Sequence, residues 1–167
     1  MNLYIVRHAI AVDRETSSDE DDSQRPLTDT GSKKMQKIAK GLRQLNVDFD
    51  VILSSPYVRA RDTAEILANE FKLKDKLAFS ENLVPPGDFD QLIIEINEKY
   101  NVNSLALVGH EPMLSEFISY LAIGGTGLAV TMKKGGICCL TSDDLAQERR
   151  ATIEWLLTPA IMVELSK

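Results

Sequence analysis

The sequence lacks any hydrophobic run long enough to cross a membrane. Its apolar runs, such as Leu3 to Val6 and Leu105 to Val108, are far shorter than the roughly 20 residues that a membrane-spanning helix needs. No secretory signal is evident either, because Arg7 interrupts the first apolar run and no basic segment precedes it. These absences predict a cytoplasmic protein that has no membrane partner.

Cysteine is scarce, and positive charge is outnumbered. The two cysteines, Cys138 and Cys139, are neighbours that would point to opposite faces of a strand, so we expect no disulfide between them. No C-x-x-C pair or further Cys and His group has zinc-site spacing. With 25 acidic and 19 basic side chains, the net charge of −6 argues against binding to nucleic acid. An anionic substrate would therefore have to be held by a local group of basic residues.

The chain length of 167 residues and the hydrophobic content of 44% predict one globular domain that spans residues 1–167. We find no internal repeat and no interior linker. The segment from Asp13 to Asp22 contains six acidic residues and a single basic one, Arg14. A charge run of this kind is typical of a solvated surface loop, and a lid or a partner-recognition segment is the alternative.

Short apolar segments alternate with amphipathic ones along the chain. We predict strands at residues 3–6, 51–53, 104–108, 136–141 and 151–157. Helical spacing of apolar residues predicts helices at about 29–45, 56–71, 89–100 and 113–121. The second of these should begin at Pro56, after a capping serine. The alternation predicts an α/β fold, a three-layer α/β/α sandwich with a mainly parallel central sheet.

Reactive side chains follow three of the predicted strands. Arg7 and His8 follow the first strand, Ser55 and Arg59 follow the second, and His110 follows the third. In an open parallel sheet, ligands bind beyond the carboxyl ends of the strands. We therefore expect these five side chains to meet at one edge of the sheet and to form a catalytic site.

This set of residue types suits phosphoryl transfer. A neutral imidazole such as that of His8 can attack phosphorus, while the guanidinium groups of Arg7 and Arg59 bind the phosphoryl oxygens. The N-terminus of the second helix would add its dipole, and His110 could donate a hydrogen bond as charge develops. We expect no lysine near this site. Such a site needs neither a metal nor another cofactor.

The basic residues near the site are not equivalent. Arg59 and Arg61 lie about 200° apart around a helix, so they cannot both face one pocket. We predict that Arg59 faces the site and that Arg61 faces solvent. Arg25, at the far end of the acidic segment, could swing over the site and bind phosphate, and a plain surface arginine is the alternative.

Metal-dependent and serine-nucleophile chemistry are less well supported. Both histidines together with Glu111 or an acidic-loop carboxylate could bind zinc, but Arg7 beside His8 would repel a divalent cation. The nucleophile elbow Gly-x-Ser-x-Gly is absent. The glycines at 124–127 lack the lysine or the further glycine of a nucleotide-binding loop.

Four segments together resemble the histidine phosphatase superfamily, which includes cofactor-dependent phosphoglycerate mutase and the small SixA-type phosphohistidine phosphatases. In the first of them, Ala9 stands where many members have glycine. The segments follow the order of the family, span most of the chain, and are Leu3 to Ala9, Arg25 to Gly31, Ser54 to Ala64 and Val108 to Pro112.

The resemblance implies roles for individual residues. His8 would be the phosphorylated nucleophile, with Arg7, Arg59 and His110 as phosphate ligands and Arg25 as a contributor. Ser55 lies in the second phosphate-binding segment.

The small size of the chain is similar to that of the SixA-type branch, which acts on phosphohistidine in signalling proteins. The implied function is a phosphohistidine phosphatase, and the implied partner is a protein such as a histidine phosphotransfer domain. Mutase-like members carry a glutamate as proton donor in a segment that here begins at Glu81, which makes Glu81 the candidate acid. The alternatives are a phosphatase of small phosphomonoesters and a non-enzymatic phosphate-binding module.

Overall fold

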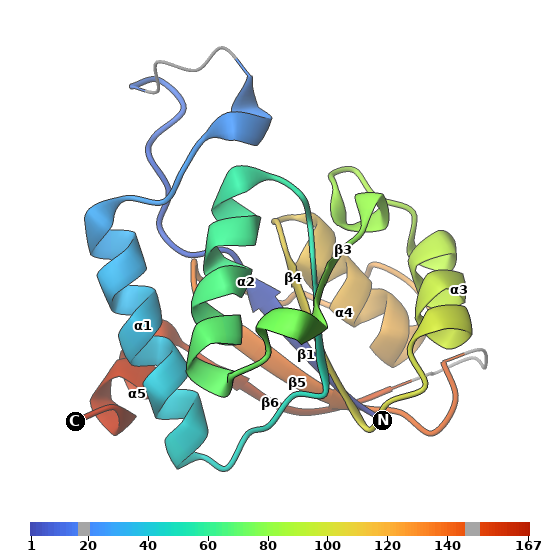
Figure 1. The fold of residues 1–167 in the computed structure, drawn as a ribbon. Helices are drawn as coiled ribbons and strands as arrows, with labels where there is room; N and C mark the ends of the chain where they lie inside the picture. Colours follow the sequence, from blue (N-terminus) through green and yellow to red (C-terminus); the bar gives the residue numbers. More distant parts are fainter. Residues whose placement is uncertain (17–20, 146–150) are drawn as a thin grey trace.

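A central six-stranded sheet carries helices on both of its faces (Figure 1). The computed structural model describes residues 1–16, 21–145 and 151–167, so part of the predicted acidic loop, residues 17–20, lies outside the described residues. The strand order is β3-β2-β4-β1-β5-β6. Strands β3, β2, β4 and β1 are parallel, whereas β5 is antiparallel to both of its neighbours, β1 and β6. The predicted α/β fold with a mainly parallel sheet is confirmed. The strands are β1 (Asn2–Arg7), β2 (Val51–Ser54), β3 (Leu77–Phe79), β4 (Ser104–Gly109), β5 (Ile137–Thr141) and β6 (Thr152–Leu157).

The helices form the two outer layers. One face of the sheet is covered by α1, α2 and α5, and the other face is covered by α3 and α4 (Figure 1). In the described part of the chain, no helix is both long and apolar enough to span a membrane. The α-helices are α1 (Asp29–Gln44), α2 (Val58–Phe71), α3 (Phe89–Lys99), α4 (Met113–Ile123) and α5 (Pro159–Leu165), and the short 3₁₀ helices are η1 (Asp22–Gln24), η2 (Lys74–Lys76) and η3 (Glu81–Leu83).

Residue alternation along the strands divides the core between the two faces. In β1, Tyr4 and Val6 pack with the α1, α2 and α5 side, whereas Leu3 and Ile5 pack with the α3 and α4 side. All four side chains are buried because β1 lies inside the sheet, and each face carries its own helices.

The same alternation separates the two cysteines. Cys139 belongs to the first cluster and Cys138 to the second, and both are buried free thiols. The prediction that they point to opposite faces is therefore confirmed.

The parallel strands bring the predicted site residues to one edge. Arg7 of β1 pairs with Gly109 of β4, and Ser54 of β2 pairs with Val108 of β4. Because the three strands end at the same level, the residues that follow them, including His8 and His110, emerge side by side.

Some elements differ from the sequence prediction. Strand β3 and helix α5 were not predicted, because three and seven residues are too few for a periodic pattern to stand out. Helix α2 begins at Val58 and not at Pro56, and no side chain caps its first turn. The Oγ of Ser55 accepts a hydrogen bond from the Tyr57 N–H at 3.3 Å, just before the helix, and also lies 2.8 Å from the Nε2 of His110.

The start of α1 is held directly against the chain that follows β1. Thr28 caps the helix by accepting a hydrogen bond from the Gly31 N–H at 2.9 Å. A β-carbon at Gly31 would lie 2.1 Å from the carbonyl oxygen of Ile10, so only glycine allows this approach. The helix therefore supports the loop that begins at His8.

Candidate active site

His8 is buried at the carboxyl end of β1, with 6% of its surface exposed. Its Nδ1 lies 2.7 Å from the carbonyl oxygen of Ala9. A carbonyl can only accept, so Nδ1 carries the proton and Nε2 keeps its lone pair. Burial lowers the pKa of His8 to about 3, and the nearby charge of Arg59 acts in the same direction. His8 is therefore neutral at physiological pH and has Nε2 available as a nucleophile.

His110 lies beside His8, with the two ring centres 5.3 Å apart. Its Nε2 is 2.8 Å from the Oγ of Ser55, whereas its Nδ1 is buried and has no partner. Burial lowers its pKa to about 3, and the positive charge of Arg59 contributes to the decrease. The structure thus pairs two neutral imidazoles at the edge of the sheet.

Two arginines flank the histidines. Arg59, in the first turn of α2, is only 5% exposed, and its guanidinium lies over the ring of Tyr57 at 5.2 Å from the centroid. Arg7 ends β1, and its Nη1 donates to the carbonyl oxygen of Met132 at 2.7 Å. Burial lowers the pKa of both guanidinium groups below the usual value for arginine. The strand and the helix therefore hold positive charge at a desolvated position.

Three polar atoms of this cluster are buried without a hydrogen-bond partner. They are the Nε atoms of Arg7 and Arg59 and the Nδ1 of His110. In the described residues, the one other such side-chain atom is the Oγ of Ser142, outside the cluster. Unpaired buried polar groups are costly, and N–H donors gathered beside two guanidinium charges could bind an oxyanion.

Arg25 reaches the cluster through an aspartate. Its Nε and Nη2 lie 3.1 and 3.0 Å from the Oδ1 of Asp22, and its Nη1 donates to the carbonyl oxygen of Val12 at 2.8 Å. Asp22 in turn accepts hydrogen bonds from Arg59. Asp22 therefore lies between Arg25 and Arg59 and links Arg25 to the site.

Arg61 lies away from the cluster, as the helical spacing predicts. Its side chain is 44% exposed, and it forms long ion pairs with Asp62 and Glu65.

Glu81 is exposed in η3, where it lines a surface pocket together with residues of α3. No hydrogen bond or ion pair within the described ranges joins Glu81 to His8, Arg59 or His110. The structure brings together Arg7, His8, Ser55, Arg59 and His110, but it leaves Glu81 outside their network.

Sequence reasoning missed Lys134. Its positive charge contributes to the low pKa of His8, so the expectation that no lysine lies near the site is wrong. The backbone explains its position, because the N–H of Gly135 lies 3.1 Å from the carbonyl oxygens of both Arg7 and His8. Lys134 precedes β5 and is far from His8 in the sequence, so no local pattern could have revealed it.

Thr63 and Asp22 were also missed as parts of the site. The Oγ1 of Thr63 accepts a hydrogen bond from the Ala9 N–H at 3.0 Å and donates to the carbonyl oxygen of Arg59 at 2.7 Å. Thr63 lies one turn after Arg59 on α2, which could have suggested that it faces the site. Asp22 belongs to a run of acidic residues in which nothing distinguishes it from its neighbours.

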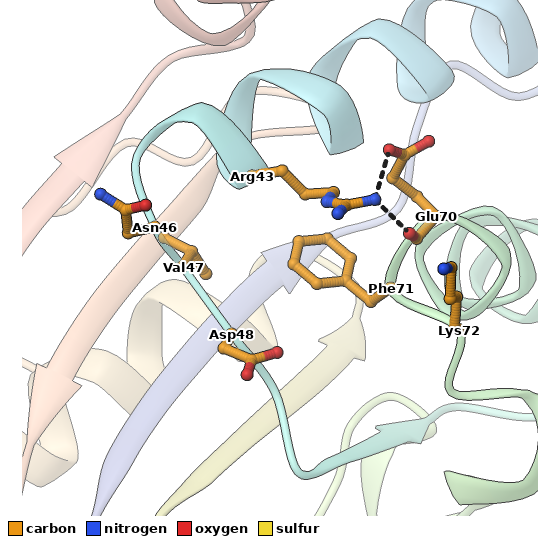
Figure 2. A pocket seen from close by; sticks show the side chains of 7 residues that line it. All are labelled: Arg43, Asn46, Val47, Asp48, Glu70, Phe71 and Lys72. Carbon is orange, nitrogen blue, oxygen red and sulfur yellow. Dashed lines mark hydrogen bonds and ion pairs between the residues drawn. The ribbon is translucent and has the colours of Figure 1, made fainter.

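A separate pocket of about 350 Å³ lies between the C-terminal ends of α1 and α2 (Figure 2). Its charged side chains are partly paired with each other, since Arg43 contacts both the carbonyl oxygen and the carboxylate of Glu70. Arg59 is in the first turn of α2, at the other end of that helix. The pocket is therefore distinct from the histidine cluster.

Comparison with known proteins agrees with this geometry. A SixA phosphohistidine phosphatase from Escherichia coli is 26% identical over 161 residues, which cover 95% of this chain and 94% of that protein. An uncharacterized protein of Picosynechococcus sp. is 40% identical over 144 residues, covering 85% and 86% of the two chains.

The fold agrees as well. A solved structure of the protein histidine phosphatase SixA complexed with tungstate superposes with a TM-score of 0.80 and 25% identity, covering 96% of this chain and 98% of that one. The model of the histidine phosphatase superfamily (branch 1) matches residues 3–116, a range that includes both histidines and both buried arginines. The chain, with its paired histidines at the strand ends, thus belongs to the histidine phosphatase superfamily.

Proposed function

We propose that this phosphatase removes the phosphoryl group from phosphohistidine, through a phosphorylated His8. The observation that carries the proposal is the hydrogen bond from His8 Nδ1 to the carbonyl oxygen of Ala9, which leaves the lone pair on Nε2. The burial that keeps the ring neutral supports the same role, because a protonated imidazole cannot attack phosphorus.

The proposed reaction has two balanced steps. In the first, the Nε2 of His8 attacks phosphorus, the P–N bond of the substrate breaks, and its electron pair stays with the leaving imidazole. In the second, water attacks the phosphorus bound to Nε2, the P–Nε2 bond breaks and its electron pair returns to Nε2, and both protons of the water leave with the phosphate as H₂PO₄⁻. The proton on Nδ1 of His8 stays in place throughout, held by Ala9.

The surrounding groups would stabilise the transferred phosphoryl group. Arg7 and Arg59 supply positive charge and unpaired Nε–H donors. If the hydroxyl of Ser55 donates to the Nε2 of His110, the proton of that ring lies on Nδ1, which becomes a third free donor. Lys134 adds long-range positive charge near His8.

The carboxylates near the site favour phosphohistidine over alkyl esters. An ester needs a general acid to protonate its leaving alkoxide, whereas the imidazole of phosphohistidine can depart as a neutral base. Asp22 is a poor acid, since burial alone would raise its pKa but Arg59 and Arg25 hold it below the usual value. Among the described residues, no hydrogen bond or ion pair joins Glu81 to either histidine.

The substrate would therefore be a protein that carries phosphohistidine, and we propose a signalling protein such as a histidine phosphotransfer domain. The similarity to SixA of Escherichia coli over nearly the whole chain supports this assignment.

Comparison of kcat/KM for a phosphohistidine protein, an aryl phosphate and an alkyl phosphate tests the proposal. We expect the phosphohistidine protein to be the best substrate and the alkyl phosphate the poorest. His8→Ala should abolish turnover and the phosphoenzyme, which should be acid-labile and stable to base. Arg61→Ala, which alters an exposed side chain of the same helix, is the matched control and should retain both.

Two outcomes would contradict the proposal. A sugar phosphate as the best substrate, with that activity lost in Glu81→Gln, would identify Glu81 as the acid of a small-molecule phosphatase. Oxyanion binding without turnover of any phosphorylated compound would indicate a phosphate-binding module.

A further inference from the structure

The carboxylate of Asp22 lies between two arginines at the edge of the histidine cluster. Its Oδ2 is 2.9 Å from the Nη2 of Arg59, and its Oδ1 is 3.0 Å from the Nη2 of Arg25. The backbone carbonyl oxygen of Asp22 also accepts a hydrogen bond from the Nη1 of Arg59 at 2.7 Å. Arg59 is thus held by two oxygens of one residue, one from the main chain and one from the side chain.

The segment that carries Asp22 is itself anchored to the chain after His8. Ala11 pairs with Leu27, and the Val12 N–H donates to the carbonyl oxygen of Pro26 at 2.9 Å. Asp21 caps η1 by accepting a hydrogen bond from the Ser23 N–H at 2.9 Å. Asp22, the first residue of η1, therefore belongs to a segment whose backbone is tied to the loop that begins at His8.

We propose that Asp22 is a positioning residue that orients Arg59 toward the phosphoryl group. Asp22 occupies the edge of the guanidinium that carries Nη1 and Nη2, and the Nε of Arg59 is left buried and unpaired. That Nε–H is the donor available to a phosphoryl oxygen. The inference rests on the proposed function, because it assigns the phosphoryl group to the site that contains Arg59.

Electrostatics supports the same arrangement. Burial lowers the pKa of Arg59, and the nearby charge of Arg25 lowers it further, so the side-by-side placement of the two arginines favours an anion between them. Asp22 supplies that anion and pairs with both. Without it, mutual repulsion and lost hydrogen bonds would free the Arg59 side chain to adopt other rotamers.

An alternative role for the same contact makes the opposite prediction. A carboxylate bound to a phosphate-binding arginine could act as a competitor that the substrate must displace. Loss of the carboxylate would then strengthen oxyanion binding. If Asp22 positions Arg59, loss of the carboxylate weakens oxyanion binding. The sign of the change in affinity therefore distinguishes the positioning role from the competitor role.

The experiment measures the dissociation constant of vanadate by calorimetry for the full chain and for Asp22→Asn, Asp22→Ala and Asp22→Glu. We expect Asp22→Asn and Asp22→Ala to weaken vanadate binding about ten- to a hundredfold, because small displacements of a binding group have effects of this size. Asp22→Glu, which keeps the charge, should restore part of the loss. Asp13→Asn removes an exposed charge nearby and serves as the control, with unchanged affinity expected.

A double-mutant cycle shows whether Asp22 acts through Arg59. In an Arg59→Lys background, Asp22→Asn should cause little further loss of vanadate affinity, whereas independent effects would add. A merely structural role for Asp22 would lower the denaturation midpoint without this dependence on Arg59. Asp22→Asn has nearly the same shape as the native residue, so it serves if Asp22→Ala fails to fold.

The outcomes also separate this inference from the proposed function. Equal or tighter vanadate binding in both Asp22→Asn and Asp22→Ala overturns the positioning role and leaves the phosphatase proposal intact. A wild-type protein that binds vanadate but does not turn over phosphohistidine contradicts the substrate assignment alone.

Discussion

Burial beside arginines controls the protonation of both histidines of the chain. His8 and His110 are 6% and 2% exposed, and the charge of Arg59 acts on both rings. A buried imidazole flanked by positive charge resists protonation, so each ring stays neutral far below the usual histidine pKa of about 6.5. A phosphoryl acceptor needs this state, and the fold maintains it.

The neutral histidines should make the fold less stable in acid. In the unfolded chain they take up protons near pH 6.5, whereas in the folded chain they do so near pH 3. The stability that comes with the neutral histidines is therefore fully present above pH 6.5, and it is lost as the pH falls from 6.5 toward 3. Between pH 6 and pH 5 the free energy of unfolding should fall by about 1.2 kcal/mol per histidine. Urea denaturation at each pH measures this.

His110→Asn provides the comparison for that measurement. With one of the two groups removed, the slope between pH 6 and pH 5 should be about half that of the native chain. An unchanged slope in the variant, or a flat profile in the native chain, would contradict the neutral state of these rings.

The planar fork of Arg59 should be required for oxyanion binding. Phosphate or vanadate at a hundred times its dissociation constant should stabilise the native chain by about 2.7 kcal/mol through ligand linkage. Arg59→Lys should lose most of this gain, because an ammonium group cannot reproduce the planar guanidinium, which contacts Asp22 through Nη1 and Nη2 and leaves its Nε–H for the anion. Thermal denaturation with and without the anion measures the effect.

Arg61→Lys is the matched control, since Arg61 is exposed two residues along the same helix. Full stabilisation in Arg59→Lys, or an equal loss in Arg61→Lys, would show that the anion binds elsewhere.

At the level of elements, two helices hold the loop that begins at His8. Helix α2 reaches it through Thr63, whose hydroxyl accepts a hydrogen bond from the Ala9 N–H. Helix α1 reaches it through Gly31, which lies against the carbonyl of Ile10. His8 is therefore on a loop whose backbone is supported on both sides, which suits the proposed role of a nucleophile that must meet a phosphorus atom in a defined direction.

Replacement of Gly31 by alanine should disturb this support. The added β-carbon would lie 2.1 Å from the carbonyl oxygen of Ile10, so the helix or the loop must move. We expect a loss of about 1–3 kcal/mol in the free energy of unfolding, as for other overpacked sites, together with reduced turnover.

Gly125→Ala is the control, because a β-carbon there meets no atom within 4 Å. Denaturant unfolding and turnover are measured for both variants. If Gly31→Ala is as stable and as active as Gly125→Ala, the close packing of α1 is not needed.

At the level of the whole molecule, the charge distribution is uneven. The chain has a net charge of −6, yet Arg7, Arg59 and Lys134 gather around His8 at one edge of the sheet. An overall acidic protein can therefore present a local site for an anion, since the pocket potential is set by the nearest charges.

Catalysis by this molecule should not depend on a metal ion. The positive charge that Arg7, Arg59 and Lys134 place near His8 repels divalent cations. Turnover should be unchanged after incubation with a strong chelator. Loss of activity that added Mg²⁺ or Zn²⁺ restores would contradict the role given to the arginines.

Much of the fold and of the site could be predicted from the sequence, because the relevant signals are local. Each of the two histidines directly follows a strand with an apolar run, β1 or β4, and parallel strands that share a register bring such residues together. The helical repeat alone predicted that Arg59 faces the site and that Arg61 faces solvent. The same periodicity placed α1, α3 and α4 close to their observed bounds.

Only the tertiary structure decided the contacts between segments that are distant in the sequence. Lys134 reaches the site because Gly135 donates to the backbone of Arg7 and His8, and Asp22 meets Arg59 across the space between η1 and α2. Neither contact has a periodic or motif signal, since one lysine or aspartate among many becomes distinct only when packing brings it near a partner. The sequence by itself determined which residues could perform the chemistry, and the packing decided which charges orient them.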